Sequence, residues 1–215
     1  MKKTETQRKL SYDAFKHTID ELISSKKINK LKTQEDYFDI CGNYWIIDKY
    51  IASSGVFDES MTPNTISTYD KAIKQGYAIN IPVQLLDDAS VVCFEYCNIS
   101  KLLPNESCYL KTMSLEDIKK LKLNESGEEI LTLEEALEHI ANRTQVIVEI
   151  INDSTTDKLE QKVVSAISKY IDKYDCYENI AVMSINPYSL KYMFENLPYI
   201  TRILKSGDFK EKNSK

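Results

Sequence analysis

Glycine and histidine are both scarce in this chain of 215 residues. The five glycines are well separated, and the nearest two, Gly42 and Gly55, are thirteen positions apart. The sequence therefore lacks the glycine-rich loops that cradle phosphates in dinucleotide-binding and P-loop proteins. The two histidines, His17 and His139, are too far apart in sequence for a paired-histidine metal motif. They also provide few candidate residues for acid–base catalysis by histidine. We interpret both as surface residues.

The chain also has no long apolar run and no excess of positive charge. No segment approaches the roughly 18 apolar residues that a membrane span requires. The 28 Lys and Arg residues are interspersed with 33 Asp and Glu residues, which gives a net charge of −5. We therefore expect no binding to the phosphates of a nucleic acid. The N-terminus is charged and no apolar segment follows it, so we expect no secretory signal and a cytoplasmic protein.

The five cysteines are odd in number and do not form the paired motif of a zinc site. Cys93 and Cys97 could form a redox pair with Cys108, but an alternating strand more simply buries one of these thiols. We therefore predict reduced thiols, several of them buried, with neither a metal nor a redox role.

Residues 1–49 have a pattern that differs from the rest of the chain. Their first half has the i, i+4, i+7, i+8 spacing of one amphipathic helix. The apolar positions of this helix are Phe15, Ile19, Leu22 and Ile23. An aromatic-rich stretch over residues 37–47 predicts a second short helix that packs on the segment beginning at Tyr50.

From residue 50 onward, short apolar runs typical of strands alternate with helical patterns. Capping residues predict where several helices begin. Ser114 and Thr132 are each followed three residues later by an acidic residue, and Asn186 precedes a proline. This alternation predicts a parallel sheet with crossover helices. The predicted strands are Tyr50–Ser54, Tyr77–Gln84, Ser90–Tyr96, Gln145–Ile151, Ile180–Ile185 and Ile200–Leu204.

Seven stretches follow one another in a characteristic order, at residues 50–56, 63–65, 76–84, 91–96, 130–137, 148–152 and 184–187. In that order they resemble the glycerophosphodiester phosphodiesterase family. The resemblance covers about residues 44–209 and rests on the order of the segments rather than on any single motif. It implies a (β/α)8 TIM-barrel fold and the hydrolysis of glycerophosphodiesters, a reaction of lipid metabolism.

The chain departs from the family pattern at its first two strands. The family has Ile-Ala-His-Arg-Gly at the end of the first strand, where this chain has Ser53 and Ser54 in place of the His and Arg. The family has Glu-x-Asp on the second strand to hold a divalent cation, where this chain has Asn80 and Pro82. An amide is a poor substitute for a carboxylate ligand, and proline is no ligand.

The next two strands depart from the pattern in the same way. The family's Phe-His-Asp becomes Phe-Glu-Tyr, with Glu95 where a second catalytic histidine belongs. The family's Glu-x-Lys becomes Glu-Ile-Ile, which keeps the carboxylate at Glu149 and has Ile151 in place of the lysine. Of the family's principal chemical groups, Glu149 alone survives.

These replacements predict a vestigial pocket with no catalytic residue and no metal ligand. Its candidate substrate-binding residues are Ser53, Ser54, Asn80, Glu95 and Glu149. Hydrolysis of a phosphodiester requires proton transfer and positive charge on the developing oxygens, whereas two carboxylates would repel a phosphate. We expect no cofactor. Ca²⁺ or Mg²⁺ held by Glu95, Glu149 and Asn80 belongs to the alternative, an active hydrolase with a non-standard site.

We therefore predict a degenerate phosphodiesterase-like TIM barrel over residues 50–209, between an N-terminal helical extension (1–49) and a charged tail (210–215). With about six strands, the barrel would be incomplete and would lack its last two strand–helix units. The expected function is that of a pseudoenzyme that binds a ligand or a protein partner. An active phosphodiester hydrolase and a decayed gene product are the alternatives.

An incomplete barrel leaves unpaired strand edges at residues 50–54 and 200–204. We expect residues 11–49 to pack across this gap or below the barrel. We expect a second copy of the chain or a partner protein to close any opening that remains.

Overall fold

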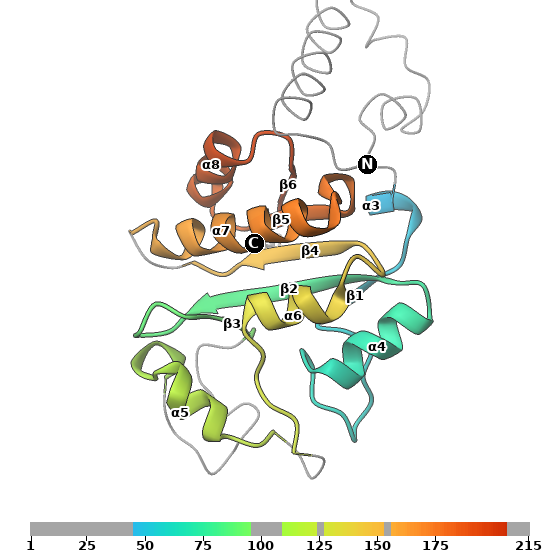
Figure 1. The fold of residues 1–215 in the computed structure, drawn as a ribbon, viewed down its shortest axis with the longest axis vertical. Coiled ribbons are helices and arrows are strands. Elements are labelled where there is room, and N and C mark those ends of the chain that lie inside the picture. The colour runs from blue at the N-terminus through green and yellow to red at the C-terminus, as the bar shows by residue number, and fades with distance from the viewer. Residues whose placement is uncertain (1–44, 96–108, 124–126, 153–155, 206–215) are drawn as a thin grey trace, which may run out of the picture.

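The computed structural model describes residues 45–95, 109–123, 127–152 and 156–205. All six predicted strands are present in it. Five of them form a sheet of parallel strands in the order β1-β2-β4-β5-β6 (Figure 1). Their bounds are Ile51–Ser53 (β1), Ala78–Leu85 (β2), Val146–Ile150 (β4), Ile180–Ser184 (β5) and Thr201–Leu204 (β6).

The sixth strand, β3 (Val91–Cys93), runs antiparallel to β2, so the prediction of an entirely parallel sheet is wrong at this strand. Val83 lies opposite Cys93, and the connection between the two strands is only residues 86–90. A parallel crossover needs a dozen or more residues, and this connection is therefore long enough only for a hairpin. The backbone N–H of Leu86 closes the turn by donating to the carbonyl of Ser90 at 2.9 Å.

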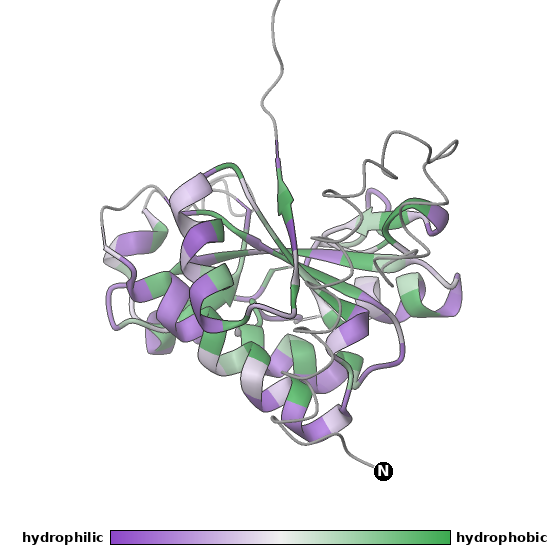
Figure 2. Cartoon of the chain, turned by 90° about the horizontal axis from the view of Figure 1, so that it is seen from above, coloured by the Kyte–Doolittle hydropathy of each residue, from purple (hydrophilic) through white to green (hydrophobic). Residues whose placement is uncertain are grey.

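Helices cover one face of this sheet, as the alternating sequence pattern predicts. In Figure 1, α6 and α7 lie along the near side of β2 and β4. Apolar strand residues such as Ile79, Val148 and Val182 join the helices in one large buried cluster. In Figure 2 the strands are mostly hydrophobic, whereas the helices also carry hydrophilic turns. These helices are α4 (Ile66–Lys74), α6 (Leu133–Ile140), α7 (Lys158–Tyr174) and α8 (Pro187–Asn196).

The predicted helix starts are confirmed. Thr132 and Glu135 form a reciprocal capping box at the start of α6, with hydrogen bonds of 3.1 and 2.8 Å. Ser114 and Asp117 do the same at α5 (Leu115–Lys120). The Asn186 side chain accepts from the backbone N–H of Tyr188 at 3.0 Å at the start of α8.

The structure also contains two short 3₁₀ turns, η3 (Leu110–Thr112) and η4 (Tyr177–Asn179). None of the described helices is long and apolar enough to cross a membrane.

The other face of the sheet corresponds to a barrel interior, and Trp45 closes its N-terminal end. Trp45 begins the short helix α3 (Trp45–Asp48), which lies at the end of the sheet where β2 and β4 start (Figure 1). The indole packs against Ala78, Ile147 and Ala181, and its Nε1 donates to the carbonyl of Glu178 at 2.8 Å. The small side chains of Ala78 and Ala181, near the starts of β2 and β5, thus leave room for one large aromatic ring.

The described sheet is open, with β1 and β6 as its two edges. Ile51 on β1 and Leu204 on β6 are both exposed. Of the segment predicted to pack at this opening, only residues 45–49 are described, and they lie at the N-terminal end of the strands. The helix predicted around residues 15–23 lies outside the described residues. Closure of the opening by a second copy or a partner stays a prediction.

Trp45 gives the first testable prediction. Substitution of Trp45 by Ala should lower the free energy of unfolding by about 3 kcal/mol, because it opens a cavity over three strands and leaves the Glu178 carbonyl without its donor. Urea denaturation followed by far-ultraviolet circular dichroism measures this change. The matched variant Trp45→Phe keeps an aromatic ring and should lose less stability. Equal stability of Trp45→Ala and the wild-type protein would contradict the role assigned to this ring.

Candidate functional site

Two polar side chains meet on the inner face of the sheet, just above the apolar end that Trp45 covers. Asn80 follows Ala78 by two residues on β2, and Glu149 follows Ile147 by two residues on β4, so all four point to the same face. Asn80 Nδ2 donates to Glu149 Oε2 at 2.7 Å. Asn80 is 5% exposed and Glu149 is 7% exposed, so the carboxylate is largely withdrawn from water.

The lysine that directly follows β6 supplies the counter-charge of this carboxylate. Lys205 Nζ lies 2.6 Å from Glu149 Oε1, and the lysine side chain is 49% exposed. The backbone N–H of Lys205 donates to the carbonyl of Ser184 at 3.0 Å, which extends the pairing of β6 with β5 by one residue. Lys205 follows Ile203 by two residues, so the alternation of a strand directs both side chains to the inner face.

The sequence comparison with the family did not identify Lys205. The sequence predicts a strand that ends at Leu204. The family pattern places its lysine two residues after Glu149, where this chain has Ile151. The only signal in the sequence was the alternation that runs from Thr201 through Ile203 to Lys205. That signal specifies a face but not a partner, because Glu149 is 56 residues away along the chain.

Two buried polar atoms in this region lack a hydrogen-bond partner among the described residues. They are Asn80 Oδ1 and Ser54 Oγ. Because Asn80 directs its Nδ2 at Glu149, its Oδ1 is left as a buried acceptor without a donor. Such an atom costs about 1–3 kcal/mol unless water or a ligand satisfies it. Asn80 Oδ1 is therefore suited to accept a hydrogen bond from a ligand.

A fixed turn brings the two serines to the C-terminal end of β1. Ser53 is exposed and pairs with Asn80 across the sheet. Ser54 is buried with a positive φ of 62°, and its carbonyl accepts from the backbone N–H of Asn64 at 2.8 Å. Gly55 follows with a φ of 87°, and a Cβ at this position would lie 2.7 Å from Thr68 Cβ. The turn thus requires a glycine here.

The five candidate residues do not all lie together in the structure. Asn80 and Glu149 are in direct contact, and Ser53 pairs with Asn80 across the strands. Glu95 is exposed beyond the end of β3, and no hydrogen bond or ion pair joins it to Asn80 or Glu149. Both oxygens of Glu149 accept from neighbouring donors, so a cation at this carboxylate would compete with Lys205. Within the described residues, no group of three or more His, Cys, Asp or Glu could hold a metal ion.

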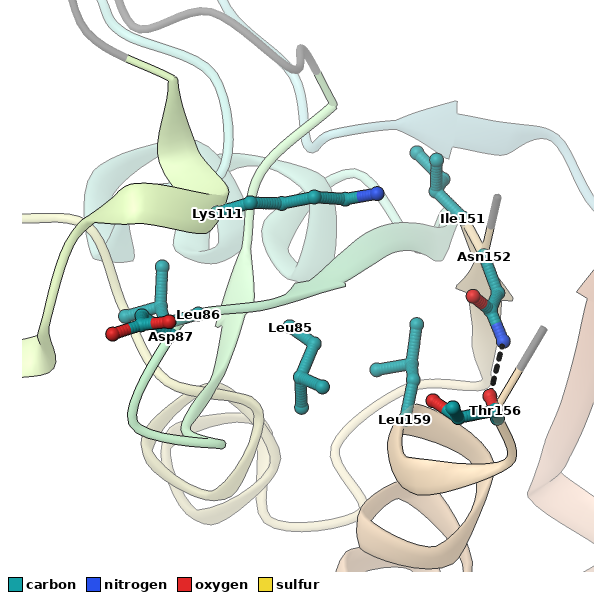
Figure 3. Close-up of a pocket in the computed structure, with 8 residues that line it drawn as sticks. All are labelled: Leu85, Leu86, Asp87, Lys111, Ile151, Asn152, Thr156 and Leu159. Carbon is teal, nitrogen blue, oxygen red and sulfur yellow. Dashed lines mark hydrogen bonds between the residues drawn. The ribbon is translucent and has the colours of Figure 1, made fainter. Parts of the chain in front are cut away.

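A separate pocket of about 230 Å³ opens beside the C-terminal ends of β2 and β4. Figure 3 shows Lys111 extended across it, with the amino group toward Ile151 and Asn152. Asn152 Nδ2 donates to the carbonyl of Thr156 at 3.3 Å and to the buried carboxylate of Glu160 at 2.7 Å. Asn80 and Glu149 do not line this pocket. The lining residues are Leu85, Leu86, Asp87, Lys111, Ile151, Asn152, Thr156 and Leu159.

The two described cysteines, Cys93 and Cys176, are free thiols and both are buried, as the sequence predicts. Cys93 is buried, and this burial raises the pKa of its thiol, so it is a core residue. Cys97 and Cys108 lie outside the described residues. His139 lies in the last turn of α6, and its Nε2 is 2.9 Å from Oδ1 of Asp70 on α4. His139 thus belongs to the outer helical layer, away from the inner face.

Comparison with known proteins identifies the family. The sequence model of the glycerophosphoryl diester phosphodiesterase family matches residues 57–214. The chain belongs to this family. Comparison with the sequences of curated proteins finds no match.

Solved phosphodiesterase structures share this fold. An Oleispira antarctica phosphodiesterase, solved with its product sn-glycerol-3-phosphate, matches with a TM-score of 0.61 and 22% identity over 74% of this chain and 66% of that protein. A glycerophosphodiester phosphodiesterase from Agrobacterium tumefaciens matches with a TM-score of 0.60 and 18% identity over 72% of this chain and 65% of that protein. One from Parabacteroides distasonis matches with a TM-score of 0.59 and 20% identity over 72% of this chain and 63% of that protein. The chain thus spans a little under two thirds of these structures.

The Asn80–Glu149 contact gives the second prediction. Substitution of Asn80 by Asp should destabilise the fold by about 1–3 kcal/mol in metal-free buffer at neutral pH, because it places two carboxylates side by side. Millimolar Mg²⁺ or Ca²⁺ should restore part of this stability by screening the repulsion. Thermal unfolding with and without each cation measures both effects.

Asn80→Leu is the matched control, because it removes the hydrogen bond without adding charge. Its unfolding temperature should not respond to the cations. If Asn80→Asp were as stable as the wild-type protein in metal-free buffer, the contact would not be the constraint described here.

Proposed function

We propose that this family member binds a small phosphorylated polyol at the Asn80–Glu149–Lys205 cluster and does not hydrolyse phosphodiesters. The observation that carries this proposal is the engagement of Glu149 on both oxygens. Asn80 donates to Oε2 and Lys205 donates to Oε1. A carboxylate held in this way is a poor general base and a poor metal ligand, because either role requires it to give up a donor.

The rest of the cluster offers no substitute for the missing chemistry. Ser53 and Ser54 are the hydroxyls at the end of β1, and within the described residues neither has a histidine beside it to accept its proton. Glu95 is not in contact with the cluster, and we propose no resident divalent cation. Loss of both proton transfer and charge stabilisation should lower the rate of hydrolysis by several powers of ten.

The ligand class follows from family membership and from the groups that remain. The Oleispira antarctica relative holds sn-glycerol-3-phosphate, a molecule that combines hydroxyl donors with an anion. In this chain the cluster offers an unpartnered acceptor, Asn80 Oδ1, and a half-exposed cation, Lys205. A polyol phosphate matches both groups.

An active phosphodiesterase is the second candidate function. Family membership favours it, and so does Lys205, because this lysine returns a positive charge to a site that lacks the arginine and the lysine of the family pattern. A positive charge alone leaves the proton transfer without a group to perform it, so we prefer binding without turnover.

Hydrolysis of glycerophosphocholine by the purified full chain separates the two functions. We expect no release of glycerol 3-phosphate at rates typical of enzymes, about one per second or more, in EDTA, Mg²⁺ or Ca²⁺. Calorimetric titration of the same protein with sn-glycerol 3-phosphate should show binding.

The control for the hydrolysis assay is Glu149→Ala. If the wild-type protein turns over the substrate and this variant does not, the chain is an active phosphodiesterase with a non-standard site. If the wild-type protein neither hydrolyses the ester nor binds the phosphate, the proposed function is wrong.

A further inference from the structure

Among the described residues, Lys205 is the charged group that forms an ion pair with the buried carboxylate of Glu149. It lies two strands away from Glu149, so its side chain spans the width of β5 to make the contact. A lysine side chain has considerable rotamer freedom, and a hydrogen bond to a fixed acceptor removes much of it. Glu149 therefore holds the ammonium group at a defined place above the inner face.

This arrangement leaves Lys205 able to bind a second anion. An ammonium group has three N–H donors, and Glu149 Oε1 accepts from one of them. The lysine side chain is half exposed, whereas the Glu149 side chain is only 9% exposed. Both oxygens of Glu149 are already engaged, so an incoming anion meets the lysine rather than the carboxylate. The pair is neutral overall, so recognition depends on short hydrogen bonds rather than on long-range attraction.

Asn80 provides a second, independent indication of a ligand. Its Oδ1 is buried and has no hydrogen-bond partner within the described part of the chain, and the Nδ2 of the same amide donates to Glu149 Oε2. The two neighbours of Glu149 thus present complementary functions, one donor to an anion and one acceptor for a hydroxyl. A molecule with an anionic group a few bonds from a hydroxyl would satisfy both.

We propose that Lys205 binds the anionic group of the ligand, that Glu149 is the positioning residue of the Lys205 ammonium, and that Asn80 Oδ1 accepts a hydrogen bond from a ligand hydroxyl. Glu149 thereby acts through Lys205 and does not contact the ligand. This assignment rests on the proposed function, because it concerns the same cluster. It also places part of the binding site directly after β6, a strand that carries none of the motif residues compared with the family pattern.

Calorimetric titration of the full chain tests the assignment, with sn-glycerol 3-phosphate and inorganic phosphate as the two probes. The wild-type protein should bind the polyol phosphate more tightly than phosphate, because only the former also reaches Asn80. Lys205→Met should weaken both by about tenfold or more, the effect of losing a charged hydrogen bond. Lys205→Arg should retain part of the affinity.

The matched control is Lys191→Met, which removes an exposed lysine of α8 that pairs with Glu195 on the same helix. It should leave both affinities unchanged. Thermal unfolding of every variant shows that it is folded at the temperature of the titration.

The role of Glu149 is tested by Glu149→Gln in two backgrounds. A positioning role predicts that this change weakens binding in the wild-type protein and has little further effect in Lys205→Met. An equal loss of affinity in both backgrounds would show that Glu149 acts independently of Lys205 and would overturn the positioning role.

The outcomes separate this assignment from the proposed function. If the wild-type protein binds sn-glycerol 3-phosphate and Lys205→Met binds it equally well, the role of Lys205 is wrong and the proposed function stands. If the wild-type protein binds neither probe, both are wrong. If it binds phosphate and sn-glycerol 3-phosphate equally, the role of Asn80 is wrong.

Discussion

The buried carboxylate of Glu149 is the constraint on which the rest of this site depends. A buried carboxylate needs partners, and two side chains supply them, Asn80 on β2 and Lys205 directly after β6. These contacts tie together strands that are separated along the chain and across the sheet. The same contacts occupy the carboxylate, which supports the proposal that retention of Glu149 does not by itself preserve the family's chemistry.

The inner face of the sheet explains why these polar groups can be buried without a closed barrel around them. Trp45 and the small residues Ala78 and Ala181 fill the N-terminal end of that face. The next level along the strands holds Asn80 and Glu149, and Lys205 lies beyond them toward solvent. Polarity thus rises along the strands from apolar side chains to an accessible ammonium group, which supports the proposed binding of a small polar molecule at this face.

Much of this fold was predictable because its signals are local. Short apolar runs located β2, β4 and β5, and capping residues located α5, α6 and α8. The direction of β3 was missed although the short 86–90 connection excluded a crossover. The Asn80–Glu149 contact was only partly predictable, because the family pattern places both residues at strand ends. Lys205 was not predictable, since its partner is set by how β4, β5 and β6 lie together and not by any spacing along the chain.

A double-mutant cycle on unfolding free energy, without any ligand, tests most directly whether Glu149 and Lys205 form the pair on which this account depends. Glu149→Gln, Lys205→Met and the combined variant would be unfolded by urea at low ionic strength beside the wild-type protein. The account predicts that the two changes are not additive, with a coupling of about 0.5–1.5 kcal/mol that favours the native pair. Additive effects, with a coupling indistinguishable from zero, would contradict it.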